Sequence, residues 1–376
     1  MNTITPRIFV AATQQNDGKT TVSLGLFGAL RKQLGRIGFI KPVGQRFVEI
    51  DGELVDEDTI LIDTTYGIFA PLADISPIAV EPEFTRKFIQ QANTDVLVRR
   101  IQNSFDRAAW EKDFVIIEGT GHAGVGSVFD LSNARVAKLL GAKAILVTQG
   151  GIGRPIDEVA LNRALFEKEG VELIGVVLNK VLPEKYDHVL EFAGKGFARL
   201  GIELLGVIPD DPVLAHPTLG QVCKAVRGDF INARASSRRL ARKVLIGDME
   251  AGHLLRQFTP GTLVVTPGDR EDVILASISL VGQNARGMCG LVLCNDLKPD
   301  AAVMQALQAS ELPAITSPLD SYTIASRIHS MTVKTLPGDE EKISRIREMS
   351  EKYINIERLL ALVKGEEETK AVIRDS

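Results

Sequence analysis

Short apolar segments alternate with longer amphipathic segments along the first part of the chain. Apolar runs of strand length occupy residues 8–12, 37–40, 114–117, 144–148, 173–178 and 204–208. Strands that are apolar throughout, separated by segments of helical length, are typical of a parallel sheet with helices on both faces. The pattern therefore predicts a doubly wound α/β domain around a mostly parallel sheet.

The same alternation restarts after a polar, arginine-rich segment. Expected strands follow at residues 243–246, 262–266, 290–293 and 314–316, and expected helices at residues 269–280, 300–310 and 321–327. A chain of 376 residues is long enough for two cores. We therefore expect an α/β domain over residues 1–230, a linker over residues 231–243, a smaller α/β domain over residues 244–335 and a helical tail over residues 336–376.

Composition argues against several classes of protein. The chain has 45% apolar and 24% charged residues and a formal net charge of −4, without the basic excess of proteins that bind a nucleic-acid backbone. Its cysteines, Cys223, Cys289 and Cys294, suggest neither a disulfide framework nor a CxxC metal motif. The sequence shows neither a signal-peptide pattern nor an apolar run of membrane-spanning length. We expect a cytoplasmic protein that binds neither nucleic acid nor membrane.

A Gly-Lys-Thr sequence lies between the first expected strand and an apolar helix. Residues 13–20 read Thr-Gln-Gln-Asn-Asp-Gly-Lys-Thr, in the strand–loop–helix order of a phosphate-binding P-loop. Such a loop offers backbone N–H groups and a lysine to the phosphates of ATP and a hydroxyl to Mg²⁺. The candidate nucleotide contacts are Thr13, Asn16, Asp17, Gly18, Lys19, Thr20 and Thr21. Thr13 replaces the first glycine of the common pattern, and the alternative interpretation is an ordinary helix start.

Polar residues also follow two other expected strands. Glu118 comes directly after the apolar run 114–117 and precedes a glycine-rich loop, residues 119–126. A carboxylate at a strand end is the usual second oxygen ligand of Mg²⁺ at a P-loop. Lys41, in a Lys-Pro-Val turn, places another cation at the same sheet edge. The alternative interpretation of Glu118 is a surface glutamate at a strand end, and Lys41 taken alone would be interpreted as a solvated lysine.

This constellation resembles the dethiobiotin synthetase-like P-loop family, and most closely the amino-terminal half of long-form phosphotransacetylases with its following DRTGG domain. The resemblance covers nearly the whole chain and rests on motifs in register. The matching positions are Gly18, Lys19 and Thr20 in the loop, Lys41 in Lys-Pro-Val, Asp58, Glu118 with Gly119 and Gly121 in Glu-Gly-x-Gly, and Asn179 at a strand end.

The resemblance implies a site for ATP and Mg²⁺. The implied metal ligands are Thr20, Asp58 and Glu118. Lys19 and Lys41 would hold phosphate oxygens and carry any phosphoryl transfer. Asn179, together with Pro209 in the Ile-Pro-Asp segment after the sixth strand, would face adenine. The family also implies a homo-oligomer, since dethiobiotin synthetases form their substrate site across a dimer.

Some positions depart from the synthetase pattern. Asn16 stands where the synthetase loop has an acidic residue near the reacting groups, and Gln45 replaces a small hydroxyl residue that helps to hold substrate. In the loop after Gly119, His122 is either a phosphate contact and acid–base group or an exposed bystander. ATP binding is compatible with these changes, which count against carboxylation of a biotin precursor.

The second domain contains two further motifs. Asp269 and Arg270 match the first two residues of the Asp-Arg-Thr-Gly-Gly signature of DRTGG domains, which are usually linked to regulation or assembly, although Asp269 could simply cap a helix. The sequence Gly-Met-Cys-Gly around Cys289 resembles the nucleophile turn of glutaminase domains in cobyrinic acid amide synthases, with His329 downstream. Cys289 begins an apolar run instead of ending one, so it and Cys294 are better interpreted as core residues.

The leading functional hypothesis is a nucleotide-binding regulatory or sensor protein that resembles the regulatory half of phosphotransacetylase. The alternative is an ATP-dependent ligase of the dethiobiotin synthetase or cobyrinic acid amide synthase type. Such an enzyme would activate a carboxylate or carbamate by phosphoryl transfer, and its substrate would be a small carboxylate or amine. A third hypothesis is a structural assembly module with a vestigial loop. Substrate-stimulated turnover of ATP would distinguish the ligase from the sensor.

Overall fold

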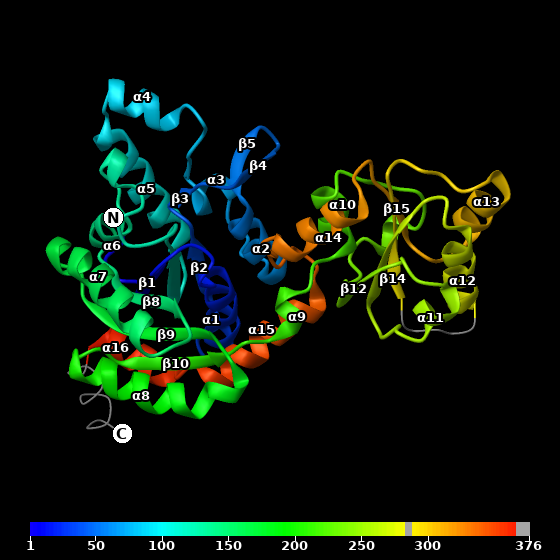
Figure 1. The fold of residues 1–376 in the computed structure, drawn as a ribbon. Helices are drawn as coiled ribbons and strands as arrows, with labels where there is room; N and C mark the ends of the chain where they lie inside the picture. The colour runs from blue at the N-terminus through cyan, green and yellow to red at the C-terminus, as the bar shows by residue number, and fades with distance from the viewer. Residues whose placement is uncertain (283–287, 366–376) are drawn as a thin grey trace. The chain divides into compact units, whose positions relative to one another are not determined.

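The structure, a computed structural model, describes residues 1–282 and 288–365 of the chain. These residues form two compact units (Figure 1). The first unit contains Met1–Asp210 together with the described residues from Thr335 onward, and the second contains Asp211–Lys334. Across the described residues, no helix combines the length and the apolar character needed to cross a membrane.

The first unit is built on a six-stranded sheet in which all neighbouring strands are parallel. The strands in spatial order are β10 (Leu204–Pro209), β9 (Leu173–Val181), β8 (Lys143–Gln149), β1 (Arg7–Ala12), β7 (Phe114–Glu118) and β2 (Ile37–Ile40). Each apolar run predicted in this part of the sequence forms one of these strands. β1, β2 and β7 are buried along their whole length, which explains why their sequences do not alternate. The predicted doubly wound α/β fold is confirmed.

Helices pack on both faces of this sheet (Figure 1). Parallel crossovers are right-handed, and the chain steps in opposite directions from β1 to β2 and from β8 to β9. These steps place α1 (Lys19–Leu34) and α7 (Gly153–Glu169) on opposite faces. α8 (Tyr186–Arg199) packs beside α7, whereas α15 (Glu340–Tyr353) and α16 (Ile356–Lys364) pack beside α1. The change of direction lies at the carboxyl ends of β1 and β8, where open α/β sheets bind ligands.

Smaller elements lie between β2 and β7. They are β3 (Val43–Gly44), β4 (Phe47–Ile50), β5 (Glu53–Asp56), α2 (Glu57–Tyr66), α3 (Leu72–Ile75), β6 (Ile78–Ala79), α4 (Phe84–Gln90) and α5 (Thr94–Ala108). β4 and β5 form an antiparallel hairpin, and β3 pairs with β6. Helix α6 (Asn133–Leu139) and the 3₁₀ helices η1 (Ser127–Phe129) and η2 (Pro183–Lys185) complete the unit.

The second unit is a smaller α/β fold around a five-stranded sheet. The strands in spatial order are β11 (Asp229–Phe230), β15 (Ala314–Thr316), β14 (Met288–Cys294), β13 (Thr262–Pro267) and β12 (Lys243–Ile246). β11 is antiparallel to β15, and the other neighbours are parallel. The helices are α9 (Pro212–Ala215), α10 (Leu219–Ala225), η3 (Arg234–Ser236), α11 (Ala251–Leu255), α12 (Glu271–Gly282), α13 (Ala301–Ala309) and α14 (Ser321–Ser330). The strands and helices expected in this part of the sequence are all present.

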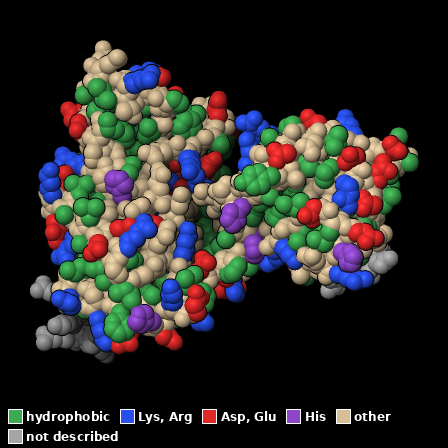
Figure 2. All heavy atoms as spheres, in the orientation of Figure 1, with side chains coloured by type: hydrophobic (Ala, Val, Ile, Leu, Met, Phe, Trp, Pro, Cys, Tyr) green, Lys and Arg blue, Asp and Glu red, His purple; other side chains and the backbone are tan. Residues whose placement is uncertain are grey.

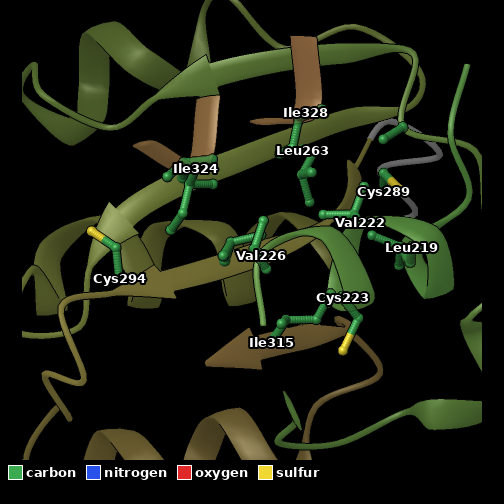
Figure 3. Close-up of a cluster of buried hydrophobic side chains, with 13 residues drawn as sticks. Leu219, Val222, Cys223, Val226, Leu263, Cys289, Cys294, Ile315, Ile324 and Ile328 are labelled. Atoms are coloured by element: carbon green, nitrogen blue, oxygen red, sulfur yellow. The ribbon is translucent and has the colours of Figure 1, made fainter. Parts of the chain in front are cut away.

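The three cysteines lie in the hydrophobic core of the second unit (Figure 3). Cys223, Cys289 and Cys294 are free thiols that pack with Leu219 of α10 and Ile315 of β15, among other buried side chains. Burial raises the pKa of the Cys289 thiol to about 12, so this residue is not a thiolate near neutral pH. Its surroundings support the interpretation as a core residue and not as a glutaminase nucleophile. The glycine at position 287 in that motif lies outside the described residues.

The boundary between the units differs from the expected one. Leu219, Val222 and Val226, in and just after α10, lie in the core of the second unit, and β11 pairs with β15. Ala241, within the expected linker, is buried in the same core. The second unit therefore begins at Asp211 and includes residues 231–243. A two-residue strand and a short helix carry too little periodicity to mark such a boundary in the sequence.

The expected helical tail belongs to the first unit. α15 lies along α1, and the two helices approach so closely that a Cβ atom on Gly25 would lie 1.8 Å from the Ser350 hydroxyl. The Arg347 guanidinium lies over the Tyr66 ring at 4.7 Å, and the Tyr66 hydroxyl donates to Leu24 O at 2.7 Å. These contacts tie the chain after the second unit to helix α1. Of the tail, residues 366–376 lie outside the described part of the chain.

Charges of both signs are mixed on the face that Figure 2 draws. On the face drawn in Figure 2, Lys and Arg side chains are interspersed with Asp and Glu side chains, and hydrophobic side chains lie between them. The whole sequence has nearly equal numbers of basic and acidic residues, 44 Lys and Arg against 48 Asp and Glu.

We expect Gly25→Ala to destabilise the chain by about 1–3 kcal/mol, because the added methyl group would overlap the Ser350 side chain in a closely packed helix pair. Urea unfolding followed by circular dichroism measures the change. Gly252→Ala in α11 is the matched control, since a Cβ atom there meets nothing within 4 Å. Equal stability of the two variants would contradict the close packing of α15 on α1.

Candidate functional site

Residues at the ends of five parallel strands meet at one edge of the first sheet. The P-loop, residues 13–20, follows β1, Lys41 follows β2, and Glu118 ends β7. Gln149 ends β8 and pairs with Asn179 near the end of β9. Because neighbouring parallel strands present their carboxyl ends side by side, residues far apart in the sequence become neighbours.

The backbone of the P-loop turns into α1 at Gly18. Gly18 has a left-handed conformation, with φ of 96°, and its carbonyl accepts the first bond of the helix from Val22 N–H at 3.0 Å. Among the residues that the structure describes, the backbone N–H groups of residues 15–21 donate to no acceptor. Consecutive unpaired N–H groups at a helix N-terminus carry partial positive charge and favour an anion.

Strand β9 holds the P-loop in place. A Cβ atom on Gly18 would lie 2.0 Å from Asn179 Nδ2, so only glycine allows this approach. Asn179 Nδ2 donates to Asp17 O at 2.9 Å, and the Lys180 ammonium donates to Asn16 O at 2.7 Å. The predicted contact Asn179 is thus adjacent to the loop, and it fixes two consecutive carbonyl groups together with its neighbour Lys180.

Asp17 braces the P-loop from within. Its Oδ2 accepts from Gln14 N–H at 2.6 Å and from the Thr13 hydroxyl at 2.8 Å, and its side chain is 2% exposed. Burial raises the pKa of Asp17, the two hydrogen bonds oppose the increase, and the nearby carboxylate of Glu158 adds to it. Asp17 therefore shapes the loop instead of offering a freely solvated charge.

Lys41 lies among three carboxylates, here called the acidic cluster: Asp56, Asp58 and Glu118. Its ammonium nitrogen is 2.9 Å from Asp56 Oδ1 and 3.4 Å from Glu118 Oε1, and it also contacts Asp58 Oδ2. Lys41, Asp56 and Glu118 are buried. Burial by itself would lower the pKa of Lys41, but the three carboxylates outweigh burial and raise that pKa. The ammonium group therefore stays charged and offsets part of the buried negative charge.

Glu118 joins the acidic cluster to α1. The Thr20 hydroxyl donates to Glu118 Oε1 at 3.1 Å, whereas Glu118 Oε2 is buried without a hydrogen-bond partner among the described residues. Burial raises the pKa of Glu118, and Lys41 acts in the opposite direction. A carboxylate with one unsatisfied buried oxygen has the capacity to accept a further donor or a cation.

The oxygen atoms of Thr20, Asp58 and Glu118 are of the type that Mg²⁺ prefers. Within the described ranges, no group of three or more His, Cys, Asp or Glu side chains is arranged to hold a metal ion. Lys41 provides a physical reason, because its ammonium group lies between the same carboxylates. The oxygen donors fit the expected metal in their chemistry, and the Lys41 ammonium group contacts two of the three residues, Asp58 and Glu118.

Lys19 is the first residue of α1 and is half-buried, like Thr20 and Thr21. Burial lowers the pKa of the Lys19 ammonium group. Glu118 opposes this effect, and Lys41 adds to it. An anion beside Lys19 would stabilise its charged form.

The remaining predicted residues lie around this centre. Pro209 ends β10 and pairs with Val181 of β9, two residues beyond Asn179. Asn16, Gln45 and His122 are exposed. The ring of His122 folds back on its own loop, because His122 Nδ1 accepts from Gly124 N–H at 3.2 Å.

Three residues that the sequence did not single out complete the site. Asp56 accepts from Asp58 N–H at 2.9 Å and caps α2, besides contacting Lys41. On α7, Glu158 Oε2 lies 3.1 Å from the Thr13 hydroxyl, and Asn162 Nδ2 is 3.4 Å from Thr13 O. Only weak sequence signals indicated two of them: Asp56 stands before a helix as a cap residue does, and Asn162 is a polar residue on the buried face of α7.

In the second unit, Arg270 has a structural role. It donates to Gly247 O at 3.1 Å and to Met249 O at 2.9 Å, and it pairs with Asp272 at 2.9 Å. These bonds join the loop after β12 to the start of α12. These contacts within the chain explain why an arginine stands at position 270, and the explanation requires no bound ligand.

Two family models match the chain. A model described as an AAA domain matches residues 6–218, and a model described as a DRTGG domain matches residues 221–331. The first match covers more than half of the 376 residues and includes every candidate residue of the site. The second match falls within the second unit.

Curated relatives share most of the chain. The phosphate acetyltransferase of Pseudomonas aeruginosa is 30% identical over 368 residues, which are 93% of this chain and 51% of that protein. The phosphate acetyltransferase of Nitrosomonas europaea is 29% identical over 362 residues, 94% of this chain and 51% of that protein. The chain therefore spans about half the length of the curated relatives it matches.

Solved structures with similar parts include the septum site-determining protein MinD of Pyrococcus horikoshii, complexed with Mg-ADP. It has a TM-score of 0.35 and 21% identity, and the match covers 56% of this chain and 84% of that chain. The CBS and DRTGG domains of a Clostridium perfringens pyrophosphatase, complexed with diadenosine tetraphosphate, give a TM-score of 0.27 and 17% identity, with 44% of this chain and 76% of that chain covered.

We expect Asp17→Asn to stabilise the chain at pH 7, because it removes a buried charge and keeps an oxygen that accepts from Gln14 N–H. The folded-state pKa of Asp17 is raised, so its ionisation opposes folding at neutral pH. This opposition disappears as the pH falls through the raised pKa toward about 4. The advantage of the variant should therefore shrink between pH 7 and pH 4 in urea unfolding.

Asp113→Asn is the control of opposite sign. Its partner Arg36 lowers the pKa of Asp113, so the ionised form supports folding. Asp113→Asn should have a smaller free energy of unfolding than the natural protein at pH 7. This difference should disappear at low pH. A pH-independent difference between Asp17→Asn and the natural protein would refute the buried-charge explanation.

Proposed function

Since this chain belongs to the AAA domain family, we propose that its first unit binds ATP together with Mg²⁺ at the P-loop. One observation carries the proposal. The backbone N–H groups of residues 15–21, which lead into α1 and form its first turn, have no acceptor among the described residues, and Lys19 belongs to this run. A run of donors with a lysine next to it can bind several oxygens of a polyphosphate at once.

The terminal phosphate lies on the side of Glu118 in this proposal. Thr20, in the first turn of α1, donates to Glu118, so the hydroxyl, the carboxylate and the Lys19 ammonium share one region. Burial lowers the pKa of Lys19, and the negative charge of the phosphates would restore its charged form. Lys19 would then neutralise charge on the phosphate oxygens.

Thr20, Asp58 and Glu118 are the residues that would hold Mg²⁺, which supplies charge neutralisation between the phosphates when it is bound. Lys41 contacts one oxygen of Asp58 and one of Glu118, so Mg²⁺ would compete with its ammonium group for these carboxylates. Phosphate oxygens offer its ammonium group a new partner. We therefore expect the nucleotide and Mg²⁺ to bind together and not separately.

The base of the nucleotide would lie near the ends of β9 and β10. Asn179 uses one amide N–H to hold Asp17 O, which fixes the side chain at the edge of the P-loop. Pro209 lies on the neighbouring strand, paired with Val181. We assign adenine to this place from the resemblance to dethiobiotin synthetases.

We assign the chain a nucleotide-responsive regulatory role, with the DRTGG domain as its second unit. The support is chemical: Asn16 and Gln45 are exposed amides, and they stand where the synthetase pattern has groups that act on a substrate. The match to phosphate acetyltransferases covers about half of those proteins, so their activity is not assigned to this chain. By the same resemblance we propose a homo-oligomer.

Lys19→Ala should raise the Kd for ATP·Mg²⁺ at least about 100-fold, because it removes the cation next to the phosphates. Isothermal titration calorimetry on the full chain measures the affinity. Lys32→Ala is the matched control: Lys32 lies near the other end of α1 and pairs with Glu351 at 2.5 Å on the surface. If the two variants bound ATP equally, the P-loop site would be wrong.

A regulatory protein should hydrolyse ATP slowly. We expect ADP formation by the purified chain well below about 1 per second, the lower end of common enzyme turnover, and no stimulation by bicarbonate with diamines or by carboxylates. A coupled assay for ADP measures this rate. Brisk turnover that depends on a carboxylate or an amine would instead establish the ligase.

A further inference from the structure

Asn162 joins three separate segments through one buried amide group. Its Oδ1 accepts from Ala123 N–H in the glycine-rich loop at 2.8 Å. Its Nδ2 donates to Thr13 O in the P-loop at 3.4 Å and to Glu158 O in α7 at 2.8 Å. Asn162 is 7% exposed, so its polar atoms need partners, and these contacts provide them.

The two loops that Asn162 joins would contact different parts of a nucleotide. In the proposed site the P-loop would surround the phosphates as a whole, whereas the glycine-rich loop begins directly after Glu118, which accepts from Thr20. The glycine-rich loop therefore stands on the side of the terminal phosphate. One backbone bond also joins the end of β1 to the glycine-rich loop, with Ala12 N–H at 3.4 Å from Gly121 O.

Helix α7 is a stable base for this connection. Glu158, one turn before Asn162 on the same helix, accepts from Gln14 Nε2 at 2.8 Å and also contacts the Thr13 hydroxyl. Two neighbouring side chains of α7 thus hold the start of the P-loop, and one of them extends to Ala123. The pairing of β1 with β7 brings the two loops together, and α7 adds a side-chain connection between them.

We infer that Asn162 is a positioning residue that sets the distance between the P-loop and the glycine-rich loop, and through it the preference of the site for ATP over ADP. The inference rests on the proposed nucleotide site. Asn162 acts through Thr13 and Ala123. ADP lacks the terminal phosphate, so its binding depends on the P-loop and much less on where the glycine-rich loop lies.

Asn162→Ala removes these hydrogen bonds. The Kd for ATP·Mg²⁺ should rise about tenfold and that for ADP·Mg²⁺ by less than about twofold in calorimetric titrations of the full chain. Asn162→Asp keeps the acceptor for Ala123 N–H but has no N–H for Thr13 O. The Kd for ADP·Mg²⁺ divided by the Kd for ATP·Mg²⁺ should therefore fall in both variants. Melting temperatures, recorded in parallel, identify the variants that are folded.

Asn232→Ala is the matched control, because Asn232 makes the same kind of three-way connection in the second unit. It donates to Leu307 O at 2.6 Å and Ser310 O at 3.1 Å and accepts from Ala314 N–H at 2.9 Å. This control should lower the melting temperature and leave the ratio of the two affinities unchanged. Folded Asn162 variants that keep the natural ratio, or weaken both nucleotides equally, overturn the inference alone. A natural chain that binds neither nucleotide overturns the proposed function with it.

Discussion

The pairing of buried charges at the carboxyl edge of the first sheet constrains the rest of the site. A buried charge without a partner costs several kcal/mol. Lys41 meets this requirement by contacting Asp56, Asp58 and Glu118, which come from a hairpin, a helix and a strand of the main sheet. Glu118 in turn accepts from Thr20 on α1. The hairpin, the helix, the strand and α1 are thereby connected around the Lys41 ammonium group. A cation that binds there would compete with Lys41 for its carboxylate contacts.

The strands were the part of the structure that the sequence predicted best. Their apolar runs are local patterns, and strong burial on both faces makes them unambiguous. The P-loop, Lys41 and Glu118 were also found, because each stands directly after such a run. Asp56 and Asn162 were missed, since their roles depend on contacts with distant residues that no local periodicity records. The unit boundary was misplaced because β11 has only two residues.

The departure of the P-loop from the common pattern also has a structural explanation. Thr13, in the place of the usual first glycine, is 3% exposed, and its hydroxyl lies 2.8 Å from both Asp17 Oδ2 and Thr148 Oγ1. The side chain that replaces glycine thus becomes an internal brace between the loop and β8. Gly18 could not be replaced in this way, because Asn179 leaves no room for a Cβ atom there.

The chain leaves the first unit after Asp210 and returns to it at Thr335. In sequence terms the second unit is an insertion, and α15, which covers α1, is synthesised only after that insertion is complete. During translation the second unit can therefore fold while the helix after the P-loop still exposes an apolar face. The first unit can therefore complete its packing only after the second unit has been synthesised.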